Sequence, residues 1–185
     1  MRIIAGTARS RTIEAPRGRD TRPTLDRVRE NLFNILRSDV PDSRVLDLFS
    51  GSGALALEAL SRGARRAVLV DCDRQAHEVE VRNVRALGFE AQAEVLRCDW
   101  RDALRRLTAA GERFELFFLD PPYAMHDLTA VTAQLLELAA PDCLLVTEHQ
   151  AGHPYLVAEG WTQTDSRRYG YAGITMYRLK EDNAP

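Results

Sequence analysis

The sequence predicts an α/β fold in which a parallel sheet carries helices on both faces. From residue 44 onward, short apolar runs alternate with segments that repeat apolar residues at helical spacing. The runs are continuously apolar, which is typical of parallel strands buried on both faces. The 185-residue chain is 45% hydrophobic, enough for one well-filled core, so we expect a single domain.

Residues 1–40 are predicted to form an arginine-rich extension of a main domain that spans residues 41–180. Residues 2–6 and 11–16 have the composition of two short strands joined by a polar turn, which predicts a hairpin. A helix follows, and Thr24 is its expected N-cap. Its apolar face consists of Leu25, Val28, Leu32, Ile35 and Leu36.

The main domain is predicted to alternate strands and helices in chain order. The expected strands are 44–49, 67–71, 93–99, 115–120 and 143–149, and the expected helices are 54–62, 74–87, 100–110 and 128–140. Gly63 and Gly88 follow the first two helices and are expected to end them. Residues 160–179 contain two strand-like runs with no helix between them, which predicts a final antiparallel hairpin.

Composition argues against several classes of function. Cys72, Cys98 and Cys143 are odd in number and far apart, so we expect neither a disulfide framework nor a zinc site, and no metal. The start of the chain lacks the apolar segment of a signal peptide, and we expect a cytoplasmic protein. Residues 1–37 hold nine arginines and four acids, a net +5 against −7 for the rest of the chain, which favours a phosphate-binding arm.

A cofactor site is predicted where the first predicted strand meets the following helix. Gly51 and Gly53 allow a ligand to approach the backbone closely, and Ser52 lies between them. Acids end the first three predicted strands, at the edge where open α/β sheets bind ligands. These acids are Asp47, Asp71 and Asp99, with Cys72 and Trp100 next to two of them as candidates to flank an adenine ring.

The chemistry of these acids favours S-adenosylmethionine over a nicotinamide dinucleotide. Asp71 lies 20 residues after Gly51, where a carboxylate accepts from both ribose hydroxyls. Asp47 would repel a pyrophosphate but suits a ligand that carries an ammonium group. A simple tight turn at the glycines, with Asp71 capping the next helix, remains the structural alternative.

The sequence Asp120-Pro121-Pro122-Tyr123 ends the fourth predicted strand and is the predicted catalytic segment. Two successive prolines fix two φ angles and remove two N–H donors, so the turn is rigid. Asp120 and the Pro121 carbonyl are expected to accept from an exocyclic amino group, and Tyr123 to stack on its base. A rigid turn without catalytic function is the alternative for the motif alone.

Three segments together carry a resemblance to a known family. The segments RPTLDRVRENLFNIL, VLDLFSGSGALALEALSRGA and FLDPPY resemble the bacterial RsmD family of 16S rRNA guanine-N2 methyltransferases over nearly the whole chain. The resemblance implies a class I, Rossmann-like methyltransferase sheet of seven strands, S-adenosylmethionine as donor, and a guanine of the small ribosomal subunit as acceptor. Ala56 and Ser10 stand where the family usually shows glycine.

The resemblance also implies an RNA partner, which is either an assembled or a partly assembled small subunit, and we expect the enzyme to act as a monomer. The candidate RNA contacts are Arg9, Arg11, Arg22, Arg29, Arg167 and Arg168, of which the last two are placed in the loop of the final hairpin. Pairing with Asp26 and Glu30 is an equal alternative for Arg22 and Arg29. The competing functions are an adenine-N6 methyltransferase, a noncatalytic RNA-binding assembly factor and a nicotinamide oxidoreductase.

Overall fold

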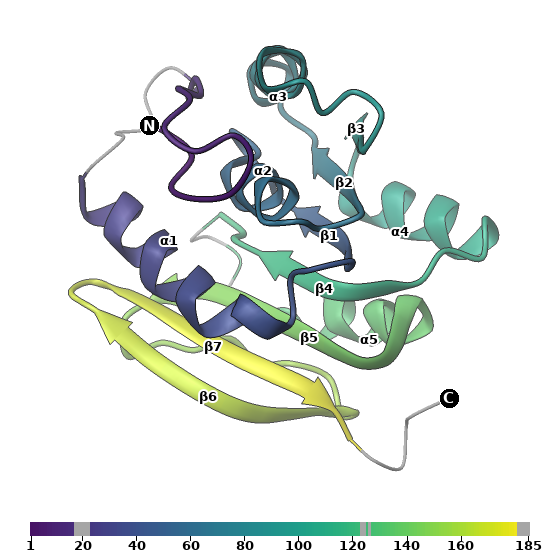
Figure 1. Cartoon of the computed structure of the whole chain (residues 1–185). Coiled ribbons are helices and arrows are strands. Elements are labelled where there is room, and N and C mark those ends of the chain that lie inside the picture. The colour runs from purple at the N-terminus through teal and green to yellow at the C-terminus, as the bar shows by residue number, and fades with distance from the viewer. Residues whose placement is uncertain (17–22, 123–124, 126, 181–185) are drawn as a thin grey trace.

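The computed structural model describes residues 1–16, 23–122, 125 and 127–180, with no account of the side chains of 23–25. Seven strands form one sheet in the order β3-β2-β1-β4-β5-β7-β6, and β7 runs antiparallel to both of its neighbours. Helices cover both faces of this sheet (Figure 1). The expected α/β architecture is confirmed. None of the helices formed by these residues is long and apolar enough to cross a membrane.

The elements follow the predicted alternation closely. The parallel strands are β1 (Arg44–Leu48), β2 (Arg66–Asp71), β3 (Ala93–Arg97), β4 (Phe114–Leu119) and β5 (Ala139–Gln150), and the final hairpin is β6 (Trp161–Tyr169) with β7 (Ala172–Leu179). The α-helices are α1 (Pro23–Ile35), α2 (Ala54–Ser61), α3 (Arg74–Leu87), α4 (Trp100–Ala109) and α5 (Thr129–Leu135).

Two apolar clusters, one on each face of the sheet, form the core. One cluster joins α1, α2 and α3 to the sheet. It includes Ile3 and Ile13 of the front segment, by which we mean residues 1–16. The other joins α4 and α5 to the opposite face and includes Trp100 and Trp161. Residues from Ile3 to Ile13 and from Val28 to Val40 contribute to the first cluster, so these parts of the first 40 residues pack against the same sheet.

Two details of the secondary structure near the start of the chain differ from the predictions. The front segment pairs through one antiparallel bridge, Arg2 with Thr12, instead of a hairpin of two strands. Its backbone N–H groups instead reach side chains of α2 and α3, as described below. The first helix begins at Pro23, so Thr24 lies inside it and is not its N-cap; proline suits the first helical position because it lacks an N–H that would go unpaired.

The other differences lie near the end of the chain. The predicted helix 128–140 is a shorter α5 followed by the 3₁₀ turn Leu136–Leu138, because residue 139 already pairs with β4. Arg167 and Arg168 lie in β6 and not in the hairpin loop, which is only Gly170 and Tyr171.

Gly6 is the position where the front segment touches the core most closely. Its φ is +83°, and a Cβ there would lie 1.7 Å from the backbone oxygen of Ser61 in α2. Gly152 has a similar φ of +85° but nothing within 4 Å of such a Cβ. The pair therefore separates backbone strain from steric overlap.

We expect Gly6→Ala to destabilise the protein by about 3 kcal/mol or more, because overlap adds to the left-handed backbone strain. Gly152→Ala should cost only about 1 to 2 kcal/mol, the strain alone. Urea denaturation of both variants measures the difference. Equal losses would show that the front segment adjusts freely around α2.

Candidate active site

A cavity lies at the carboxyl ends of β1, β4 and β5, where three acids from three strands line it. Asp47 belongs to β1, Asp120 directly follows β4, and Glu148 lies near the end of β5. The glycine-containing loop after β1 forms another wall through Gly51 and Ser52. The structure thus brings the predicted catalytic acid and part of the predicted cofactor loop to one cavity.

Asp47 is a buried acid with one oxygen available for a ligand. Its Oδ2 accepts the N–H of Ala56, in the first turn of α2, at 3.2 Å. Its Oδ1 is buried without a hydrogen-bond partner among the described residues. Burial and the neighbouring acids Glu80 and Asp120 raise the pKa of Asp47 well above its usual value. A ligand cation would give Oδ1 a hydrogen-bond donor and would also stabilise the ionised form of the buried carboxyl group.

The loop after β1 needs its glycines for conformation and for space. Gly51 and Gly53 have φ of +60° and +75°, and a Cβ on Gly53 would lie 2.6 Å from the Leu69 side chain. Asp71 supports the loop, because its Oδ2 accepts the Gly51 N–H at 3.0 Å and its Oδ1 accepts the Asp73 N–H at 2.9 Å. Asp73 is the N-cap of α3, accepting from Ala76.

Two polar residues of α3, which the sequence reasoning missed, hold the loop from behind. The Ser50 hydroxyl donates to the fully buried Glu80, and Asn83 donates to the carbonyls of Ser52 and Glu14 at 2.9 and 3.0 Å. Asn83 thus links the front segment to the cofactor loop. Both residues lie on the buried face of α3, a position that the helical periodicity of residues 74–87 marks.

The remaining predicted cofactor residues lie apart from this cavity. Asp99 is the N-cap of α4 and accepts the Arg101 N–H at 2.9 Å. Trp100 is 6% exposed within the second core cluster, and the Arg101 guanidinium lies over its ring at 4.3 Å. Cys72 is exposed after β2. Cys72 follows β2, the neighbour of β1, and Asp99 and Trp100 follow β3, on the far side of β2; parallel pairing brings these three strands to the same edge of the sheet.

The proline segment begins with Asp120 on the cavity wall. Asp120 is exposed, Pro121 is buried, and the Pro122 carbonyl accepts the Met125 N–H at 2.8 Å. Tyr123, predicted to stack on the target base, lies outside the described residues.

Glu148 was also missed by the sequence reasoning. Burial and the negative charge of Asp120 raise its pKa to about 8. The register that pairs Leu119 with Thr147 places the next residues, Asp120 and Glu148, at the same level of adjacent strands. The signal in the sequence is an acid near the carboxyl end of the predicted strand 143–149, the kind of position that singled out Asp47 and Asp120.

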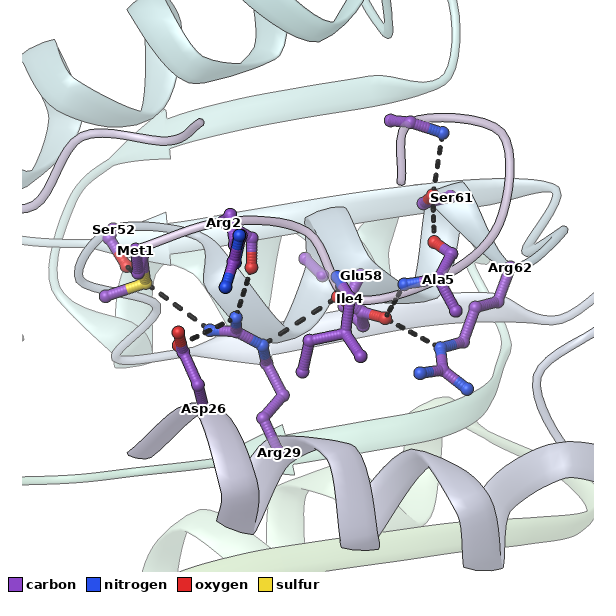
Figure 2. A network of polar contacts seen from close by, with 12 residues as sticks. Met1, Arg2, Ile4, Ala5, Asp26, Arg29, Ser52, Glu58, Ser61 and Arg62 are labelled. Carbon is purple, nitrogen blue, oxygen red and sulfur yellow. Dashed lines mark hydrogen bonds and ion pairs between the residues drawn. The ribbon is translucent and has the colours of Figure 1, made fainter. Parts of the chain in front are cut away.

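Arg29 lines the cavity but is held by the protein itself (Figure 2). Its guanidinium, only 5% exposed, donates to the Arg2 carbonyl and to Asp26. Its Nε lies 3.8 Å from Oε2 of the buried Glu58, and burial lowers the pKa of Arg29. Of the two interpretations of Arg29, an ion pair with Asp26 is therefore the one that the structure shows. The buried guanidinium has little exposed surface with which to bind an RNA phosphate.

Glu58 connects three parts of the chain. Its carboxylate accepts the backbone N–H groups of Ile4 and Ala5 at 2.8 and 3.1 Å and pairs with Arg62 at 2.7 Å (Figure 2). Because Arg29 of α1 reaches the same carboxylate of α2, the front segment and α1 are both tied to the helix that begins at the cofactor loop.

The other predicted RNA contacts that the structure describes belong to two segments, residues 1–16 and β6. Arg9 is exposed, and Arg11 donates to the carbonyls of Leu87 and Ala86 at the end of α3, a role in helix capping. Arg167 pairs with Asp165 at 2.8 Å, and Arg168 donates to the Gly170 carbonyl. Arg22 lies outside the described residues.

The sheet order, with an antiparallel β7 between β5 and β6, and the acids along its ligand-binding edge define a class I, Rossmann-like methyltransferase fold. The family described as Conserved hypothetical protein 95 matches residues 1–178. The chain belongs to this family, the one that the sequence analysis identified by resemblance.

Relatives and solved structures match over nearly the full chain. The Ribosomal RNA small subunit methyltransferase D of Escherichia coli K12 is 36% identical, covering 100% of this chain and 91% of its own. The protein of the same name from Haemophilus influenzae is 33% identical, covering 98% and 94%. The structure of a hypothetical protein from Thermus thermophilus superposes with a TM-score of 0.80 at 37% identity, covering 95% and 98%.

The buried Glu80 makes stability depend on pH. Its pKa is raised to about 8 by burial, whereas the unfolded chain has an ordinary glutamate. Between about pH 4.5 and 8 the unfolded state loses this proton and the folded state keeps it, so stability falls as pH rises, by at most about 1.4 kcal/mol per pH unit.

We expect Glu80→Gln to flatten that fall, because an amide does not titrate. Urea denaturation at pH 5, 6, 7 and 8 measures it, with Glu78→Gln on the exposed side of α3 as the control. A variant that loses stability as steeply as the unmodified protein would show that Glu80 is ionised in the folded state.

Proposed function

We propose that this protein transfers a methyl group from S-adenosylmethionine to the exocyclic N2 amine of a guanine in 16S rRNA. The observation that carries the proposal is the placement of Asp47 and Asp120 on one cavity beside the cofactor loop. Relatives at 33–36% identity bear the name Ribosomal RNA small subunit methyltransferase D, and the family match covers residues 1–178.

The residues at the cavity fit the donor. The unpartnered Oδ1 of Asp47 suits the ammonium group of its amino-acid part, and the glycine loop admits a ligand close to the backbone. Asp71 retains lone pairs for ribose hydroxyls beyond its two backbone bonds, and Asp99, Cys72 and Trp100 would lie toward the adenine. Three acids around one cavity also favour a positively charged sulfonium.

When bound, S-adenosylmethionine supplies an electrophilic methyl group. The amine nitrogen of guanine is planar, and its lone pair is delocalised into the ring. Asp120 and the Pro121 carbonyl accept its N–H groups and orient the lone pair toward the methyl, which the rigid prolines make precise. The carboxylate stabilises the positive charge that develops on nitrogen. The proton then leaves an acidic ammonium, so no strong base is needed.

The partner is a small ribosomal subunit, assembled or partly assembled, and the enzyme acts in the cytoplasm as a monomer. Residues 1–37 supply the net +5 charge that favours RNA phosphates. Arg9 and Arg11 of the front segment and Arg167 and Arg168 of β6 are the exposed candidates among the described arginines. Arg11 donates to backbone carbonyls and Arg29 is buried, so a structural role is favoured over contact with RNA for both.

One assay tests this function against its competitors. The protein is incubated with radiolabelled donor and, separately, with small subunits, free rRNA and DNA from cells that lack the enzyme, and products are digested to nucleosides. We expect label in N2-methylguanosine. Label in N6-methyladenine supports the adenine alternative, and RNA binding without transfer supports the assembly factor; either result overturns the proposal.

Replacing Asp120 isolates the catalytic step. We expect Asp120→Ala to reduce transfer at saturating donor by about 100- to 1000-fold, because the amine loses its main acceptor. Donor affinity by calorimetry should change only a few-fold, and Asp102→Ala, an exposed acid of α4, should leave both unchanged. Full turnover by Asp120→Ala would refute the role of this carboxylate.

A further inference from the structure

Glu148 is an acid to which the proposed transfer mechanism assigns no contact with the target base, only a share in the negative charge of the cavity. It lines the same cavity as Asp120, from the adjacent strand and at the same level. It is half-buried, whereas Asp120 is exposed. Glu148 is therefore less exposed than Asp120, the acceptor proposed for the amine. A base whose amine contacts Asp120 would bring a second atom to Glu148.

The surroundings of Glu148 call for a hydrogen-bond donor. The residues with charged groups that share the cavity are Asp120 after β4, Asp47 from β1, Arg29 from α1 and Met1, whose terminal ammonium donates to the Ile13 carbonyl at 3.4 Å. Arg29 is committed to Asp26, to the Arg2 carbonyl and to Glu58, so it does not neutralise Glu148. Burying a carboxyl group among acids is unfavourable unless a ligand donates to it.

Guanine has such a donor next to the amine that Asp120 would hold. Its N1–H lies on the same edge as the N2 amine. An acceptor beside Asp120 can therefore contact N1 while Asp120 holds the amine. Adenine presents an N1 lone pair at the corresponding place, which an ionised carboxylate repels. Bases taken out of their stack are read by hydrogen bonds to this edge.

We propose that Glu148 accepts the N1–H of the target guanine and thereby selects guanine over purines that carry no hydrogen at N1. This inference rests on the proposed function and adds a residue that determines base specificity. An ionised carboxylate can only accept, whereas a protonated carboxyl group also donates, so selection of guanine is coupled to loss of a proton. With the pKa of Glu148 raised to about 8, selection of guanine strengthens as pH rises through 8 and levels off above about pH 9.

The test uses 2-aminopurine, which keeps the exocyclic amine but has a lone pair at N1. Small subunits are reconstituted with either guanosine or 2-aminopurine at the nucleotide that the labelling assay maps. We expect kcat/KM at pH 8.5 to be roughly 10- to 100-fold higher for guanosine, the value of one specific base contact. At pH 6.5 the ratio should fall by about tenfold or more, because protonated Glu148 donates to N1 of 2-aminopurine.

Glu148→Gln should reduce the ratio to about one at both pH values, since an amide both donates and accepts and does not titrate. Glu137→Gln, an exposed acid near α5, is the matched control and should keep the ratio and its pH dependence. Circular dichroism checks the fold of both variants.

The outcomes separate the two claims. If the unmodified enzyme methylates guanosine and 2-aminopurine equally well at pH 8.5, or if folded Glu148→Gln keeps the ratio, this inference is overturned while the proposed function stands. If Glu148→Gln does not fold, the ratio of kcat/KM for guanosine to that for 2-aminopurine in the unmodified enzyme still tests the inference. If guanosine itself is not methylated, both claims fail.

Discussion

The parallel register of β1, β4 and β5 is the constraint on which the site depends. Pairing of Asp47 with Phe118 and of Leu119 with Thr147 brings the ends of three strands to one edge of the sheet. Parallel strands have this consequence because each crossover helix returns the chain to the same starting side. Acids some 73 and 28 positions apart in the sequence, Asp47 with Asp120 and Asp120 with Glu148, therefore line one cavity.

The resulting cluster of acids is costly to bury in the folded chain. Burial and mutual repulsion raise the pKa values of Asp47, Glu80 and Glu148. Such strain is common at functional sites, because a ligand of the right charge relieves it. The helix ties formed by Glu58 and Asn83 keep the front segment and the cofactor loop in place around the cluster.

Most of the fold and part of the site were predictable from local patterns in the sequence. Helix α3 ends at Gly88 as predicted, since helical periodicity and a C-terminal glycine are local signals. The conformation of the front segment was not predictable in this way. Its N–H groups pair with Glu58, Ser61 and Asn83, which are 53 to 69 positions away. No local pattern encodes such contacts.

The same reason explains the missed acids. Glu80 belongs to a helix and Glu148 to a strand, and an acid in either setting is usually solvated. Only the tertiary structure shows that Glu80 is fully buried behind Ser50 and that Glu148 lies beside Asp120. For Arg29, pairing with Asp26 was foreseen, but its contact with Glu58 depends on how α1 packs against α2.

A crystal structure of the protein with S-adenosylhomocysteine is the most direct measurement of the central claim, that acids gathered by the strand register hold the donor opposite its acceptor. The account predicts the ligand ammonium within hydrogen-bonding distance of Asp47 Oδ1, with the sulfur facing the Asp120 carboxylate. A ligand bound at another edge of the sheet, or one whose sulfur points away from Asp120, would contradict it.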